Sequence, residues 1–143
     1  ILDASSGGGI PEAEVFLHEV VLTKSDVNNL HTTPVLVSNS DLALAAGQGA
    51  VIFQASTEVV TDDDGTPFVG SGNRITVTNG ALDVVKQFFD GQYNSTGYRA
   101  LPSSVIENIT ADTGWSIDAT GAITGGGTNS TITLKIYYRK VTV

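Results

Sequence analysis

The 143-residue sequence contains no cysteine, and its only histidines are His18 and His31. Without cysteine, the chain can form no disulfide, no thiolate nucleophile and no cysteine-ligated zinc site. No apolar run approaches the roughly 20 residues that a membrane-spanning helix needs, so we expect no membrane span. The seven basic residues are scattered and form no stripe, which argues against binding to nucleic acid phosphates.

Uncharged polar residues and glycine are abundant instead. Glycine occurs 16 times, and charged residues make up only 15% of the chain. Threonine is β-branched and favours strands, whereas glycine, asparagine and serine favour turns. With 41% apolar residues and a length that suits one domain, the composition predicts a folded, β-rich domain. The net charge of −8 favours solubility and complements a basic partner.

Residues 1–13, ILDASSGGGIPEA, differ in composition from the rest of the chain. Three consecutive glycines, two serines and a proline cannot hold regular structure, so this segment is predicted to be a flexible N-terminal arm. Residues 14–143 are predicted to form a single β-rich domain. No signal peptide is visible, and because the first residue is Ile1 rather than methionine, we expect further sequence to precede it.

The stretch VVLTKSDVNNLHTTPVLV, residues 20–37, changes character twice. Thr23 followed by Asp26 resembles a capping box, with Asp in place of Glu, that opens one or two helical turns. Val27 and Leu30 are three residues apart and therefore share one face of this helix. We predict that these two side chains pack the helix onto the core.

The end of the same stretch is predicted to turn the chain into a second strand. A residue before proline is extended, so the helix must end near residues 29–31. His31 then lies at the helix C-terminus, where an imidazole can satisfy end carbonyls and favour the dipole. Pro34 begins the strand, where a missing N–H matters least. The predicted structural corner consists of Thr23, Asp26, Val27, Leu30, His31 and Pro34.

Strand signals recur along the whole domain. The predicted strands are residues 14–22, 34–38, 50–60, 74–78, 98–101, 104–110 and 130–143. Residues 50–60 are the strongest candidate for a central strand, and Asp64-Gly65 predicts a hairpin that leads to the return strand 74–78. The last strand alternates strictly, with Ile132, Leu134, Ile136 and Tyr138 on one face, which indicates a half-buried antiparallel strand.

Two segments allow more than one interpretation. Residues 81–89, ALDVVKQFF, have apolar residues at helical spacing and predict a helix, although their Val-Val and Phe-Phe pairs leave a strand open. Residues 115–117 and 122–124 could pair across the turn between them. The whole pattern predicts a mainly β, single-domain antiparallel β-sandwich or barrel with one or two short helices.

No residue pattern indicates catalysis. The chain has no Gly-x-Ser-x-Gly elbow or other nucleophile signature, although a Ser-His-Asp arrangement brought together by the fold is not excluded by sequence. His18 is predicted to lie mid-strand on the face opposite Leu17, and His31 at a helix end, so both are interpreted as structural. We therefore predict that the protein is not an enzyme, has no catalytic residues and needs no cofactor.

The acidic run Asp62-Asp63-Asp64-Gly65 raises the question of calcium. An EF-hand loop needs a ligand at its first position and a Glu six residues after the glycine, but Val60 and Ser71 occupy these positions. Asp62 and Asp64 are therefore only weak candidates for a metal site. The simpler interpretation is a charged, soluble hairpin tip, and no metal is predicted.

Five aromatic residues could form a platform for stacking against sugar rings. These residues are Tyr93, Tyr98, Trp115, Tyr137 and Tyr138. Tyr137 is predicted to face away from the buried side of the last strand and so to be exposed. Single exposed aromatic residues are common, so the platform competes with the simpler interpretation that most of these rings belong to the core.

The corner stretch also resembles a pattern that recurs in small virion proteins of tailed bacteriophages. In that pattern an apolar strand runs into Leu-Thr, and a short helix ends in Leu-His-x-Thr-Pro before the next strand. The matching residues here are Leu22, Thr23, Val27, Leu30, His31, Thr33, Pro34 and Val35. Further similar segments follow in the same order: GQGAVIFQAS, GSGNRITV and the ending LKIYYRKVTV. The resemblance spans residues 14–143 and is loose between residues 81 and 125.

This resemblance implies a structural role in the virion rather than one particular position there, and within the virion we favour a capsid decoration, or cement, protein. Such proteins are commonly small, β-rich and cysteine-free, and they bind the major capsid protein lattice on the capsid exterior, often as trimers. The expected partners are therefore the major capsid protein and further copies of the chain. The alternative is a head-fibre, tail or adhesin module that contacts host surface glycans.

The predicted arm has a possible role in such an assembly. An extended segment can add a strand to an open sheet edge of a neighbouring subunit and become ordered as it binds. The residues expected to make this capsid contact are Ile1, Leu2, Ile10 and Pro11.

Overall fold

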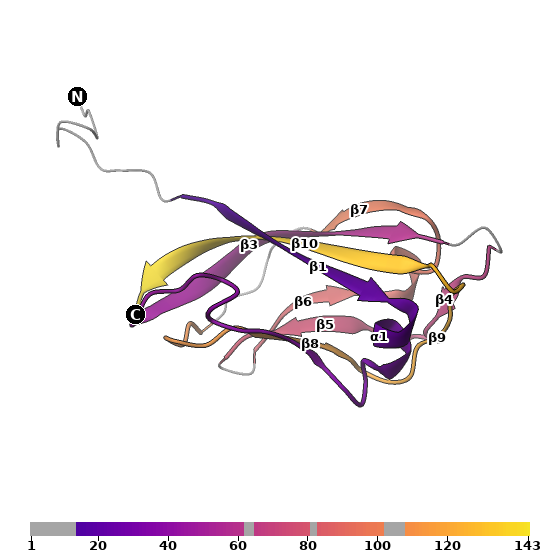
Figure 1. Cartoon of the computed structure of the whole chain (residues 1–143), viewed down its shortest axis with the longest axis horizontal. Helices are drawn as coiled ribbons and strands as arrows, with labels where there is room; N and C mark the ends of the chain where they lie inside the picture. Colours follow the sequence, from indigo (N-terminus) through magenta and orange to yellow (C-terminus); the bar gives the residue numbers. More distant parts are fainter. Residues whose placement is uncertain (1–13, 62–64, 81–82, 102–107) are drawn as a thin grey trace, which may run out of the picture.

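Two four-stranded antiparallel sheets face each other in the computed structural model, which describes residues 14–61, 65–80, 83–101 and 108–143 (Figure 1). Sheet A has the strand order β1 (Phe16–Thr23), β10 (Thr131–Thr142), β3 (Gln48–Val60), β7 (Gly97–Leu101). Sheet B has the order β2 (Val35–Val37), β8 (Trp115–Ala119), β5 (Ile75–Thr78), β6 (Val84–Phe88). The smaller elements are α1 (Lys24–Asn29), the 3-10 helix η2 (Asp90–Gln92) and the pair β4 (Phe68–Val69) and β9 (Thr124–Gly125). The predicted mainly β, sandwich-like single-domain fold is confirmed.

The core lies between the two sheets and is built from alternate residues of each strand. In β10, Ile132, Leu134 and Ile136 are fully buried, while the residues between them are partly exposed. This is the pattern of a strand with one face on the core and one face toward solvent. The neighbouring strand β3 is central in sheet A, as predicted, because it pairs with β10 on one side and β7 on the other.

The short helix α1 follows β1 directly and closes one end of the sandwich (Figure 1). The Thr23 side chain accepts a hydrogen bond from the Asp26 backbone N–H at 3.2 Å, and the Asp26 carboxylate accepts one from the Thr23 N–H at 3.0 Å. These reciprocal bonds satisfy two of the free donors at a helix N-terminus. Val27 and Leu30 are fully buried, so the helix is held to the core by its apolar face.

Residues 83–89 do not form the helix that their spacing predicts; β6 is a strand that pairs with β5. The helix prediction was wrong and the strand alternative holds, because the β-branched Val84-Val85 pair and the aromatic residues favour a strand and β5 offers a partner. An irregularity in the pairing near Val77 places both Val85 and Lys86 in the interior. Residues 81–82 lie outside the described part of the chain.

Three expected strand features also differ from the structure. Residues 50–60 and 74–78 are not a hairpin, because β3 belongs to sheet A and β5 to sheet B. Residues 115–117 do not pair with 122–124: β8 lies between β2 and β5, whereas β9 pairs with β4. Residues 108–110 are not in a strand, and 102–107 lie outside the described residues. In the first two cases the chain passes from one sheet to another between the two segments, which local turn signals do not encode.

Candidate binding face

The corner residues are brought together, but they form no reactive site. His31 follows the end of α1 and is exposed, and its imidazole makes no hydrogen bond to any part of the chain that the structure describes. Two neighbouring residues cap the helix end instead. The backbone N–H groups of Thr32 and Thr33 and the Thr32 hydroxyl all donate to the Asn29 carbonyl. The predicted end-capping role of His31 was therefore wrong, since nearer donors occupy this carbonyl. Pro34 is exposed just before β2.

His18 lies on the inner side of β1, opposite to the exposed Leu17. Its ring packs edge-on against Trp115, with ring centroids 6.4 Å apart. Within the described residues no serine or threonine hydroxyl is hydrogen-bonded to either imidazole, so the structure assembles no Ser-His-Asp arrangement there. Among those residues there is also no group of three or more side chains that could hold a metal ion. Asp62 and Asp64, the weak metal candidates, lie outside the described residues.

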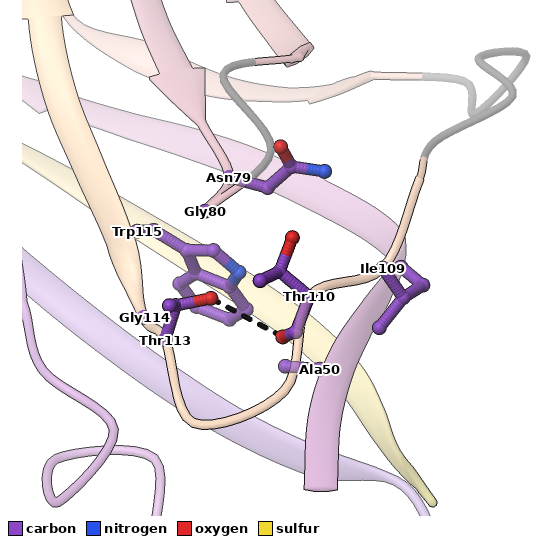
Figure 2. Close-up of a pocket in the computed structure, with 8 residues that line it drawn as sticks. All are labelled: Ala50, Asn79, Gly80, Ile109, Thr110, Thr113, Gly114 and Trp115. Atoms are coloured by element: carbon purple, nitrogen blue, oxygen red, sulfur yellow. Dashed lines mark hydrogen bonds between the residues drawn. The ribbon is translucent and has the colours of Figure 1, made fainter. Parts of the chain in front are cut away.

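A small polar cavity lies beside the buried Trp115 (Figure 2). Its walls are Ala50, Asn79, Gly80, Ile109, Thr110, Thr113, Gly114 and Trp115. Its volume of about 10 Å³ is room for about one water molecule. In the cavity wall, the Thr113 hydroxyl donates to the Thr110 carbonyl at 3.2 Å (Figure 2). This cavity is too small to bind a substrate.

The five aromatic residues considered for a sugar platform are not brought together. Tyr93, Trp115 and Tyr138 are buried in the core. Tyr138 donates a hydrogen bond to the Leu42 carbonyl at 2.8 Å and packs edge-on against Trp115, with ring centroids 5.3 Å apart. Only Tyr98 and Tyr137 lie on the solvent side of sheet A, so the five-residue platform is rejected.

The solvent side of sheet A nevertheless gathers aromatic, basic and apolar side chains on one surface, which we call the outer face of sheet A. The strand registers place its members in rows across the four strands. Its residues are Leu17, Glu19, Val21, Phe53, Gln54, Ser56, Glu58, Val60, Tyr98, Thr133, Lys135, Tyr137 and Arg139. It combines three aromatic rings, those of Phe53, Tyr98 and Tyr137, with the cations of Lys135 and Arg139.

One half of this face is organised around Lys135. Its ammonium nitrogen lies 3.5 Å from a Glu58 carboxylate oxygen and 5.6 Å from the centre of the Tyr98 ring. Burial alone would lower the pKa of the Lys135 ammonium, but the Glu58 carboxylate, helped by Glu19, raises this pKa above its ordinary value. The Tyr98 hydroxyl shares a 2.8 Å hydrogen bond with the Ser56 hydroxyl, which is fully buried beneath these longer side chains.

The other half is organised around Phe53. Gln54 pairs with Tyr137 and Ile52 pairs with Tyr138, which leaves Phe53 as an extra residue in a β-bulge. Bulges change the direction of a side chain, and here the Phe53 ring packs against Tyr137, with centroids 6.2 Å apart. The Arg139 guanidinium lies 5.3 Å from the centre of the same ring. Sequence reasoning missed Phe53 because the bulge interrupts the alternation of β3.

No protein-family model matches this chain, and comparison with curated proteins finds no match. Among the described residues, no helix is long and apolar enough to cross a membrane.

Proposed function

We propose that the chain is a structural protein of a tailed-bacteriophage virion, and specifically a capsid decoration (cement) protein. In this role it binds the major capsid protein lattice on the capsid exterior as a homo-oligomer, with a trimer favoured, and performs no catalysis. The observation that carries the proposal is the stretch from Leu22 to Val35, which resembles small virion proteins.

The structure of this stretch supports an architectural role. Thr23, Asp26, Val27 and Leu30 act in capping and packing, and the one reactive side chain, His31, is exposed and has no partner among the described residues. The cavity beside Trp115 has room for about one water molecule only. A small sandwich with a broad exposed face is suited to binding.

The predicted arm is part of the proposal. Ile1, Leu2, Ile10 and Pro11 lie outside the described residues, and we propose that they contact a neighbouring subunit. Deleting residues 1–13 is expected to reduce the amount of the chain that is retained on capsids. Unchanged capsid occupancy would remove the arm from the proposal without affecting the rest.

Copy number tests the position in the virion. Quantitative mass spectrometry of purified particles is expected to find on the order of hundreds of copies, since a decoration protein follows the symmetry of a closed shell. A few dozen copies or fewer would favour the alternative, a head-fibre, tail or adhesin module. The alternative also predicts glycan binding, for which Tyr98 is the most exposed aromatic residue at 57%.

A further inference from the structure

We propose that the outer face of sheet A is the surface with which the protein docks on its partner, and that this partner is a protein surface that is apolar and neutral to basic overall. This inference rests on the proposed role in the virion and specifies the surface that it uses. Three observations support it: the apolar side chains of the face, its charge, and its size.

The apolar side chains of the face favour a protein over a sugar. Leu17, Val21 and Val60 are 46%, 55% and 45% exposed, and Tyr98 is exposed on the edge strand β7. Aromatic residues and arginine are enriched in protein–protein contacts, and such a contact would also cover the aliphatic side chains of the face. A glycan would contact the rings and the polar groups, but it would leave the aliphatic side chains exposed to water.

The charges of the face also favour a protein partner. Lys135 and Arg139 balance Glu19 and Glu58, so the net charge of −8 lies on the rest of the chain. The acidic remainder of the chain favours the approach of a neutral or basic protein to this uncharged face over that of an acidic one. Arg139 forms no ion pair within the described residues and lies over Phe53, so one carboxylate of the partner is expected opposite Arg139.

The size of the face suits a single docking contact. The four strands have 8, 12, 13 and 5 residues. Strands lie about 4.8 Å apart and rise about 3.3 Å per residue, so the sheet presents a flat area of about 600 Å². Because side chains protrude from the sheet, the accessible area of the face is larger than this flat area. It approaches the roughly 800 Å² that one partner buries in a standard interface.

Single-cysteine footprinting tests the inference directly, because the chain has no cysteine of its own. Val21→Cys reports on the outer face of sheet A, and Leu36→Cys, at a position 73% exposed on the opposite sheet, is the matched control. Each full-length variant is treated with a maleimide in two samples. One is the free protein, and the other is particles purified from a lysate in which that variant is produced. We expect similar reactivity in the free protein, and at least a tenfold loss for Val21→Cys, but not Leu36→Cys, in the particle.

Each other result overturns the inference in a recognisable way. A chain that does not co-purify with particles contradicts the proposed function, and the docking inference with it. A chain that co-purifies while Val21→Cys stays reactive, or while Leu36→Cys is protected equally, contradicts only the docking face. Protection of Val21→Cys in the free protein assigns the face to a second copy. Glycan-array binding that Tyr98→Ala abolishes would assign it to a carbohydrate.

A second variant tests the expected carboxylate. Arg139→Gln keeps a polar side chain over Phe53 but removes the charge. An exposed ion pair contributes up to about 1 kcal/mol. When the added chain is limiting, the amount bound to particles is therefore expected to fall by about two- to fivefold, and by less at high salt. Lys24→Gln, in α1 and away from the face, is the control and is expected to have no effect. Equal occupancy of Arg139→Gln and the wild type at low salt would contradict the charge argument.

Discussion

Tyr93 places a phenol in the interior of the sandwich, where its hydroxyl donates a 2.6 Å hydrogen bond to the Asn73 carbonyl. Gly70 makes this possible, since a Cβ at this position would overlap the phenol oxygen. Burial, and to a smaller extent the neighbouring Asp90 carboxylate, raises the pKa of Tyr93 well above its ordinary value. The folded state therefore keeps this phenol protonated at a pH where the unfolded chain releases the proton.

This raised pKa makes the free energy of unfolding depend on pH. The contribution is complete below the unfolded pKa near 10 and is lost as the pH rises above it. Tyr93→Phe loses a hydrogen bond, which costs about 1 kcal/mol at pH 7. The variant also has no phenol to ionise at this position, so it does not lose this part of the unfolding free energy at alkaline pH. Urea unfolding at pH 7 and at about pH 11 should therefore show a smaller gap between variant and wild type at the higher pH. A gap that is constant or larger would contradict this account of Tyr93.

Ala43 is one of three non-glycine residues with a positive φ among those described, at 52°. A left-handed conformation costs an L-residue about 1–2 kcal/mol, and glycine avoids this cost while losing about 0.5–1 kcal/mol through the greater freedom of the unfolded chain. Ala43→Gly is therefore expected to raise the melting temperature by a few degrees. Ala46→Gly, in the same loop but without a positive φ, should lower it. A lower melting temperature for Ala43→Gly would show that the strain is absent.

At the scale of elements, α1 depends on its capping box because it has only six residues. Thr23→Val keeps the β-branched shape within β1 but removes the oxygen that accepts from the Asp26 N–H. The expected cost is about 1 kcal/mol of unfolding free energy, measured by urea denaturation. Ser25→Val, in the first turn and outside the box, is the control for a β-branched residue in the helix and should cost less. Equal costs for both variants would mean that the box contributes nothing.

The close contact between β2 and β8 depends on a missing side chain. A Cβ at Gly114, the residue before β8, would overlap the Val37 carbonyl oxygen at the end of β2. Backbone cannot move aside as a flexible side chain can, so Gly114→Ala is expected to destabilise the domain by about 3 kcal/mol or more. Gly91→Ala is the matched control, because nothing lies within 4 Å of its Cβ position and its φ is not positive. Thermal unfolding that does not distinguish the two would contradict this packing.

Some features of these helices and strands can be predicted from the sequence and others cannot. The Thr23–Asp26 box and the alternation of β10 are local patterns, and both are visible in the sequence. The partners of β8 are not, because they are decided by which apolar residues meet across the core. For the outer face of sheet A, alternation separates Tyr137 from Tyr138, but it cannot find Phe53, which depends on a bulge. The sequence therefore predicts the strands better than the surface that they build.

At the scale of the whole molecule, the first and last strands lie side by side in sheet A (Figure 1). β10 pairs with β1 along all eight residues of that strand and with β3 on its other side. Strand pairs so far apart in sequence form only when the whole chain is present, since the entropy of closing the loop is lost before the contacts are gained. The domain therefore has one cooperative core, with β10 at its centre.

Removal of β10 tests this cooperativity. A chain ending at residue 129 loses the inward side chains of β10 and leaves β1 and β3 with no shared partner, so it is expected to be unfolded. Trp115, the only tryptophan, reports the change because it is buried against Tyr138 in the intact domain. Its fluorescence should shift to the red in the shortened chain and return when a peptide of residues 130–143 is added. A control that lacks only residues 142–143 should keep the native spectrum. A cooperative unfolding transition in the 129-residue chain would show instead that sheet B and the remaining strands fold without β10.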